Sequence, residues 1–335
     1  MLTAGLISLF ALVILIVIIG WTYLLYVGLQ LARVPNQTRL KLLTVTGLNV
    51  VLSICVNLID SVFLANGLGN PKLDILLGIA IMIAIPTTLI SWIYGIGIRQ
   101  AIHAWLPTVL SPVLAVVFML FIFRPYVLET METPANSMAP TVLGPHLVSN
   151  CPLCGKKAFS NEPSKYYQNF MICENYHTSE LQLEEKTLHP QDKFVVTKFL
   201  KAQRWDLIAF HHPEEPGVIY MKRLVGLPGE SITINDGSVY IDQKKAELPN
   251  ALKEIEYFSS VPVFPDMKLS GTVERPANLS SDEYFVLGDF SAESIDSRNW
   301  EHGDGVHHAY AVPASHIVGV VSHIYWPPSR WKAFR

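Results

Sequence analysis

Charged residues are scarce in this chain of 335 residues: Asp, Glu, Lys and Arg make up 16% of it, against about 25% in ordinary globular domains. The formal net charge is −3, so nothing in the composition suggests a nucleic-acid partner. Cysteine is scarce too, and only Cys151, Cys154 and Cys173 lie outside the apolar N-terminal region. An odd number of cysteines there argues against a disulfide framework. Internal repeats and low-complexity tracts are absent from the sequence.

Apolar residues are concentrated before about residue 123, and most charged residues follow it. Four apolar stretches, at about 4–32, 42–68, 73–98 and 106–123, can each cross a bilayer, which takes about 20 residues as a helix. Buried helices of a large soluble protein are the alternative, but the length of these runs and their few charges disfavour it. The first stretch lacks the basic segment and cleavage site of a removable signal. We therefore predict a membrane region over residues 1–123.

Basic residues in the short loops predict the orientation of these spans. Three lie between spans one and two, and Arg99 lies between spans three and four, whereas Lys72 between spans two and three is offset by Asp74. The positive-inside rule puts the first and third loops in the cytoplasm. Residues 124–335 would then lie on the extracytoplasmic side of the cell membrane. Arg124, just after the fourth span, counts against this orientation.

The second region, residues 124–335, has the pattern of short strands. From Lys193 onward, β-branched and aromatic runs alternate with Gly, Pro, Asn and Asp turns. The segment 234–242 (INDGSVYID) has two such runs around Asp-Gly, which is typical of a hairpin. We expect a mostly antiparallel β domain.

Two residues of this region suit hydrolytic chemistry. Ser137 lies in 134–141 (PANSMAPT), where prolines favour an extended or turn conformation that exposes the hydroxyl. Lys222 lies in an apolar, strand-like run, and burial would lower its pKa until the neutral amine can take a proton from a serine. Taken singly, each has a more ordinary interpretation: a turn serine, and a surface lysine beside Arg223.

In this order, the segments resemble those of the type I signal peptidases of bacteria. SMAPT (137–141) resembles the nucleophile box of that family, and YMKRLVGLPGE (220–230) resembles its lysine box. Four further segments follow the family: QDKFVVTK (191–198), RWDLIAF (204–210), GDFSAESIDSRNW (288–300) and VPASHIVGVVSHIYWP (312–327). The resemblance covers about 126–328 except for one insert, and several boxes in order are far more specific than any one of them.

The resemblance implies a membrane-bound serine endopeptidase that removes signal peptides from exported precursors, with Ser137 as nucleophile and Lys222 as general base. It implies that Ser294 orients the Lys222 amine, and that Asp296 and Arg298 form a supporting salt bridge. The backbone N–H of Ser137 would be one oxyanion donor. The substrate would bind as an added strand with small side chains before the cut, as in Ala-x-Ala. No cofactor is expected for catalysis.

Some positions depart from the family pattern. Many members have a Ser or Thr two residues before the nucleophile, whose hydroxyl completes the oxyanion hole, but this chain has Ala135. Asn136 is a candidate for the missing donor. Trp205 and Phe290 replace a usual Gly and Asn, and neither belongs to the dyad.

The insert, residues 149–188, has Cys-x2-Cys followed by Cys-x3-His. Cys151, Cys154, Cys173 and His177 have the ligand types and spacings of a closed, structural zinc site. A segment of this size and polarity also needs a cross-link to fold. A disulfide between two of the cysteines is the alternative if the compartment is oxidising.

Three other functions fit the sequence less well. A Ser-His protease would use one of four histidines (His211, His212, His307 and His308), but these adjacent pairs look like solvated loop residues. A catalytically inactive membrane protein could use the insert to bind a partner, which Ala135 favours. A self-cleaving regulator shares the Ser-Lys chemistry, but four spans are foreign to that class.

Overall fold

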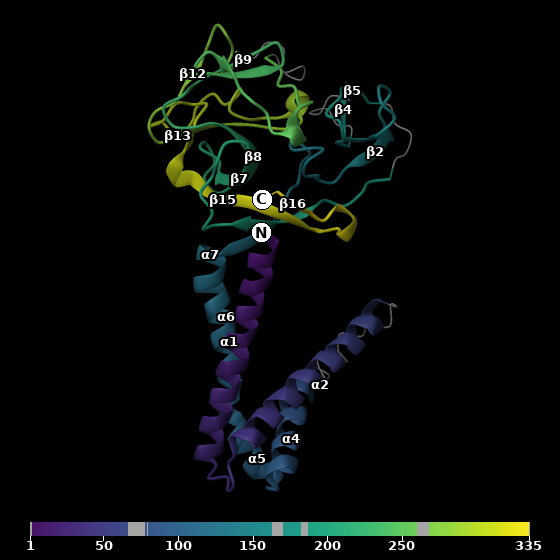
Figure 1. Ribbon diagram of the computed structural model, residues 1–335, viewed down its shortest axis with the longest axis vertical. Coiled ribbons are helices and arrows are strands. Elements are labelled where there is room, and N and C mark those ends of the chain that lie inside the picture. Colours follow the sequence, from purple (N-terminus) through teal and green to yellow (C-terminus); the bar gives the residue numbers. More distant parts are fainter. Residues whose placement is uncertain are drawn as a thin grey trace. The chain divides into compact units, whose positions relative to one another are not determined.

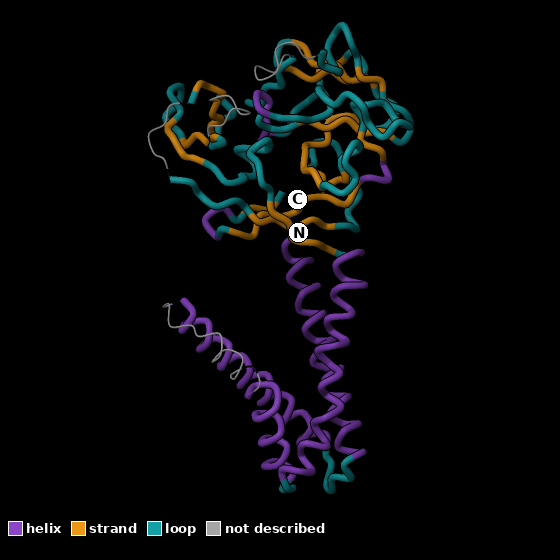
Figure 2. Tube along the Cα trace, turned by 180° about the vertical axis from the view of Figure 1, so that it is seen from behind, coloured by secondary structure: helices purple, strands orange, loops and turns teal. Residues whose placement is uncertain are grey.

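The computed structural model describes residues 2–65, 78, 80–162, 170–181, 187–259 and 268–334. The chain divides into two compact units, Met1–Ile122 and Phe123–Arg335. Long helices form the first unit, and the strands all lie in the second (Figure 2).

The first unit is helical (Figure 1). Its elements are α1 (Leu2–Leu31), α2 (Arg39–Ala65), a π-helical turn (Ala80–Ala84), α4 (Ile85–Tyr94), α5 (Ile98–Trp105), a 3₁₀ turn (Leu106–Val109) and α6 (Leu110–Phe118). A π-helical turn (Met119–Phe123) spans the boundary, and α7 (Arg124–Tyr126) belongs to the second unit. Among the described residues, three helical stretches are long and apolar enough to cross a membrane: Ala11–Leu31, Arg39–Val56 and Ile98–Tyr126.

The third and fourth predicted spans differ from the observed helices. Residues 73–77 and 79 of the third lie outside the described residues, and the apolar helix Met82–Tyr94 within it is shorter than a span. Gly95, in the left-handed conformation with φ 65°, ends α4. The chain becomes helical again at Ile98 rather than at 106, so Arg99 lies in α5 and not in a loop. The polar residues of α5 had suggested a loop, but they lie opposite a buried face of Ala101, Ala104 and Trp105.

Close packing of α1 on α5 explains one glycine of the first unit. A Cβ at Gly28 would lie 1.8 Å from the carbonyl oxygen of Ala104, so no larger residue fits. Leu25 and Leu29 of α1 pack with Ala101 and Ala104 in one buried cluster. Small residues at such crossings let helix backbones approach each other.

The second unit contains three antiparallel sheets, which confirms the predicted mostly antiparallel β domain (Figure 1). The large sheet has the order β1 (Leu128–Glu132), β6 (Lys193–Thr197), β15 (Ile317–Trp326), β7 (Leu207–His211), β8 (Ile219–Gly226), β13 (Glu283–Leu287) and β14 (Val312–Pro313), with β16 (Lys332–Ala333) on β15. The second sheet has the order β11 (Lys244–Lys245), β10 (Ser238–Ile241), β9 (Ser231–Asn235) and β12 (Ala277–Asn278). The third has the order β2 (Leu147–Asn150), β3 (Lys157–Ser160), β4 (Phe170–Cys173) and β5 (Thr178–Glu180). Short 3₁₀ turns lie at Asn250–Leu252, Ser291–Glu293, Ala314–His316 and Pro328–Arg330.

The large sheet is covered on both faces. Successive side chains of a strand point to opposite faces, and on β7 Leu207 and Ala209 join one apolar cluster while Ile208 and Phe210 join another. The predicted hairpin is β9–β10, where Asp236 and Gly237 both have positive φ, 47° and 71°. Such a pair is typical of the two-residue turns that suit strand twist.

Candidate active site

The nucleophile loop, residues 133–145, follows β1 and folds back on the buried Asn136. The N–H of Gly144 donates to Asn136 Oδ1 at 2.9 Å, and Asn136 Nδ2 donates to the Pro145 carbonyl at 2.7 Å. A Cβ at Gly144 would lie 2.7 Å from the Ala135 carbonyl carbon, so only glycine permits this approach. Both ends of the loop are therefore fixed around the half-buried Ser137.

Asn136 itself does not offer the oxyanion donor suggested for it. Besides the bond to Pro145, its Nδ2 donates to Asn161 Oδ1 at 3.0 Å. A primary amide has two N–H donors, and both are engaged. In this structure the Asn136 side chain holds the nucleophile loop.

Ser137 and Lys222 meet in the structure. Nζ of Lys222 lies 2.6 Å from Oγ of Ser137. Lys222 of β8 lies opposite the buried Ile208 of β7, so its side chain points to the same buried face of the sheet. The residue is only 3% exposed. Burial lowers the pKa of Lys222 to about 8, although Asp296 acts in the opposite direction. At pH 7 about a tenth of the amine is then uncharged, far more than for an ordinary exposed lysine.

Ser294 lies beside the nucleophile, but it does not make the predicted contact with Lys222. Its Oγ is buried and has no hydrogen-bond partner among the described residues. A Cβ at Gly288 would lie 2.0 Å from Ser294 Oγ and 2.7 Å from the Ser137 carbonyl oxygen. Gly288 is thus the residue that lets the segments of Ser137 and Ser294 approach each other.

Asp296 and Arg298 form a fully buried ion pair with Arg298 Nη2 2.8 Å from Asp296 Oδ2. The same carboxylate oxygen accepts the Gly288 N–H at 2.9 Å. Arg298 also donates to the Ser291 hydroxyl at 2.8 Å. Removing one partner of such a pair would leave an uncompensated buried charge, so the pair fixes the segment that contains Ser294.

A second buried ion pair lies next to Lys222 and was not foreseen from the sequence. Arg223 Nε donates to Asp289 Oδ1 at 2.7 Å, and Thr141 of the nucleophile loop donates to Asp289 Oδ2. Arg223 is 5% exposed. The signal in the sequence was two adjacent charged residues in the otherwise apolar run of β8, but its meaning depends on a partner far away in the sequence.

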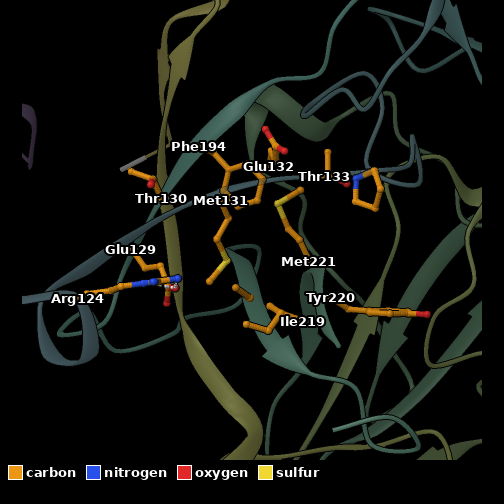
Figure 3. Close-up of a pocket in the computed structure, with 12 residues that line it drawn as sticks. Arg124, Glu129, Thr130, Met131, Glu132, Thr133, Phe194, Ile219, Tyr220 and Met221 are labelled. Carbon is orange, nitrogen blue, oxygen red and sulfur yellow. Dashed lines mark hydrogen bonds and ion pairs between the residues drawn. The ribbon is translucent and has the colours of Figure 1, made fainter. Parts of the chain in front are cut away.

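A cavity of about 290 Å³ lies between β1 and the start of β8. Apolar residues from four strands line part of it: Met131, Phe194, Ala209, Ile219 and Met221. Figure 3 shows Met131 and Met221 on either side of this space, from β1 and β8. β1 is the terminal strand of the large sheet, and β13 pairs with β8 from Arg223 onward. The cavity therefore lies next to strand edges that can receive an extended peptide.

Two of the four histidines, His212 and His307, differ from the solvated residues that the sequence suggested, whereas His308 is exposed. His212 is buried against Tyr220 and Trp300, with ring centroids 4.4 and 5.0 Å apart. His307 lies between Asp304 and Asp282, at 2.7 and 3.1 Å from its two ring nitrogens. Both nitrogens of His307 are thus engaged, whereas the Ser137 hydroxyl contacts Lys222.

The four residues of the predicted metal site come together in the insert. The ligand atoms of Cys151, Cys154, Cys173 and His177, here called the Cys/His cluster, all lie within 4.8 Å of one another. β2 ends just before Cys151, and β4 ends at Cys173. Gly155, at φ 70°, permits the turn between Cys154 and β3. All four cysteines of the chain are unpaired.

Comparison with known proteins identifies relatives of this chain. The family described as "Signal peptidase, peptidase S26" matches residues 169–326. Signal peptidase I P of Bacillus subtilis subsp. natto is 31% identical over 148 residues, which cover 43% of this chain and 72% of that protein. The chain belongs to the signal peptidase I family.

Other members of the signal peptidase I family match over different shares of their own length. Signal peptidase I U of Bacillus subtilis is 36% identical over 120 residues, 34% of this chain and 59% of that protein. A crystal structure of a signal peptidase I from Enterococcus faecalis has 28% identity, covers 37% of this chain and 98% of that chain, and has a TM-score of 0.27. The chain therefore spans about three fifths of the first of these relatives. The family match includes Lys222 and Ser294, whereas Ser137 precedes it.

Proposed function

We propose that this signal peptidase I family member is a serine endopeptidase that uses Ser137 as nucleophile and Lys222 as general base to remove signal peptides from exported precursors. The observation that supports this proposal most is the 2.6 Å separation between Lys222 Nζ and Ser137 Oγ, with the lysine buried. An uncharged amine within hydrogen-bond reach of a hydroxyl can activate it as a nucleophile.

The reaction then has two stages. Ser137 Oγ bonds to the carbonyl carbon of the substrate while its proton passes to Lys222 Nζ. The tetrahedral intermediate breaks its C–N bond, and the Lys222 ammonium returns the proton to the leaving amine. Water next attacks the Ser137 ester and gives a proton to Lys222, and the acid product leaves as Ser137 recovers its hydrogen.

Residues around the dyad support this chemistry. The backbone N–H of Ser137 belongs to the nucleophilic residue and would donate a hydrogen bond to the oxyanion. Ser294, with a buried hydroxyl that has no partner among the described residues, is suited to receive a hydrogen bond from the Lys222 ammonium. The Asp296–Arg298 pair and Asn136 hold the two segments on which Ser294 and Ser137 lie.

The cavity between β1 and β8 would receive the residues before the cleaved bond. An extended substrate would pair with these strand edges, and the apolar walls would admit small side chains, as in Ala-x-Ala. Met131 and Met221 belong to the apolar part of the lining, whereas Glu129 and Glu132 belong to its polar part.

A set of synthetic precursor peptides tests this function. The purified full chain in detergent should cleave a peptide after Ala-x-Ala, and a Leu in place of the first or third residue before the cut should lower kcat/KM by about tenfold to a hundredfold, because overfilling a packed site costs about 1–3 kcal/mol. Met221→Ala should recover part of that loss for the Leu peptides.

The products, identified by mass spectrometry, decide between the two functions. Cleavage at the expected bond excludes a catalytically inactive binding protein. Intact peptides under all conditions would favour that alternative and refute the endopeptidase.

The helical unit would anchor the protein in the cell membrane. Three stretches are long and apolar enough to cross it, and the shorter apolar helix Met82–Tyr94 would complete a fourth crossing. The basic residues Arg33, Arg39 and Lys41 favour the cytoplasm for the loop between the first two crossings. The β unit would then face the extracytoplasmic side, where exported precursors emerge.

We further propose that the Cys/His cluster binds one structural zinc ion. A tetrahedral zinc with Zn–S bonds of about 2.3 Å and a Zn–N bond of about 2.0 Å sets S–S and S–N separations of about 3.8 and about 3.5 Å. The structure has 3.7 Å between Cys154 Sγ and Cys173 Sγ, and 3.9 Å between Cys151 Sγ and His177 Nδ1. A disulfide would need about 2.05 Å. Four protein ligands leave no position for a catalytic water, so the ion would support the fold.

Metal analysis tests the zinc site. The purified chain should contain one zinc per molecule, and Cys154→Ser should lower the zinc content to about a tenth or less, since one of four ligands is lost. Cys55→Ser, which changes a cysteine of the helical unit, is the matched control and should keep the ion. A disulfide found by thiol titration in a zinc-free protein would contradict the site.

A further inference from the structure

The insert contacts the nucleophile loop through Tyr176, which lies between the cluster residues Cys173 and His177. Tyr176 has φ 62°, in the left-handed region that a tyrosine rarely adopts. Its hydroxyl lies 3.0 Å from Thr141 Oγ1. Because Thr141 donates its only hydroxyl hydrogen to Asp289, Tyr176 is the donor in this bond.

This contact continues to the general base. Asp289 pairs with Arg223, the neighbour of Lys222 on β8, and Thr141 lies in the same loop as Ser137. One carboxylate thus receives hydrogen bonds from the loop of the nucleophile and from the strand of the base. Tyr176 adds the insert to this network.

Asn161 makes a second connection on the other side of the insert. It accepts from Asn136 Nδ2 at 3.0 Å and donates to Glu293 Oε2 at 2.6 Å. Asn136 precedes Ser137, and Glu293 precedes Ser294. The N–H of Phe170 on β4 also donates to Glu293, at 3.3 Å.

Apolar packing joins the same three parts of the chain. Phe159 of β3 and Ile172 of β4 share one buried cluster with residues of the nucleophile loop (Ala139 and Leu143) and of the Ser294 segment (Phe290 and Ala292). The insert is therefore packed on both segments of the active site. Its own strands have three or four residues each, and so short a sheet needs additional support to stay ordered.

We infer that the insert positions the catalytic dyad: the metal-bound Cys173–His177 turn fixes Tyr176, Tyr176 and Asn161 hold the nucleophile loop, and zinc occupancy thereby controls kcat. The inference rests on the proposed dyad and zinc site. Tyr176 and Asn161 are positioning residues, since they act through Thr141 and Asn136. Substrate would bind at the cavity between β1 and β8, so the effect should fall on kcat rather than on KM.

Kinetics of the full chain in detergent test this inference with the Ala-x-Ala peptide. Zinc-loaded Tyr176→Phe and Asn161→Ala should each lower kcat by about tenfold with KM within about twofold, because small displacements of reacting groups cost up to about a hundredfold. Tyr240→Phe, the same chemical change on β10, is the matched control and should keep the kcat of the unchanged protein. All three variants should retain one zinc, and Tyr176→Phe and Tyr240→Phe should also keep an unchanged Tm.

Removal of zinc with a chelator is the second part of this test. The unchanged protein should lose about tenfold or more in kcat and regain it when zinc returns, whereas Tyr176→Phe should lose less, since effects that act through one network are not additive. A zinc-loaded Tyr176→Phe with full kcat, or a zinc-free protein with full kcat, would overturn the inference. If the unchanged protein cleaves nothing, or Ser137→Ala cleaves equally well, the proposed function fails instead.

Discussion

Ser137→Ala is expected to lower kcat for the Ala-x-Ala peptide by at least about a thousandfold, because no other atom replaces the bond between Oγ and the carbonyl carbon. The change removes one oxygen from a half-buried residue. The anchors of the loop stay in place, since the bonds of Asn136 to Gly144 and Pro145 do not involve the Ser137 side chain. The protein should therefore fold, keep its Tm within about 2 °C and still bind the peptide.

Initial rates of peptide cleavage, together with peptide binding followed by fluorescence anisotropy, test this expectation. Ser238→Ala on β10 is the matched control, because it makes the same change in the second sheet. If Ser137→Ala cleaves at more than about a tenth of the original rate, another residue is the nucleophile. Even a slightly misplaced nucleophile lowers the rate by about a hundredfold, so loss of the true one must lower it at least as much.

The broad organisation of the chain could be predicted from its sequence, since it depends on local patterns. Four long apolar runs predicted a helical region, and alternating β-branched runs with an Asp-Gly turn predicted antiparallel strands. The exact start of the last helical stretch was missed, because the polar residues around Arg99 interrupt the apolar run without breaking the helix. Local hydropathy does not register an amphipathic turn between two apolar segments.

The surroundings of the candidate site depend on contacts between distant residues, which no local pattern contains. Thr141 and Asp289 are 148 positions apart, and Asn161 and Glu293 are 132 apart. The side chain of Asn136 could have pointed to a substrate or into the loop, and only the approach of Gly144 decides it. His212 looked like a solvated residue for the same reason, since its aromatic neighbour Trp300 comes from another segment.

Replacement of Lys222 distinguishes general-base catalysis from a role that depends only on the positive charge of its side chain. Lys222→Met keeps the length of the side chain but removes the amine, and Lys222→Arg keeps a cation that stays protonated. Both should lower kcat by about a hundredfold to ten-thousandfold, the usual contribution of a positioned base. If Lys222 acted through its positive charge, Lys222→Arg would remain active, and this result would refute the role of base.

The pH dependence of the unchanged protein tests the same role without a mutation. Since burial lowers the pKa of Lys222 to about 8, the amine is largely neutral above this pH and becomes an ammonium without a lone pair below it. kcat should therefore level off above about pH 8 and fall about tenfold per unit at lower pH, as expected for one group that must be unprotonated. The Tm should be recorded over the same range, so that loss of activity is not confused with unfolding. A flat profile between pH 6 and 9 with a folded protein would mean that no buried amine accepts the Ser137 proton, even though the two atoms lie 2.6 Å apart.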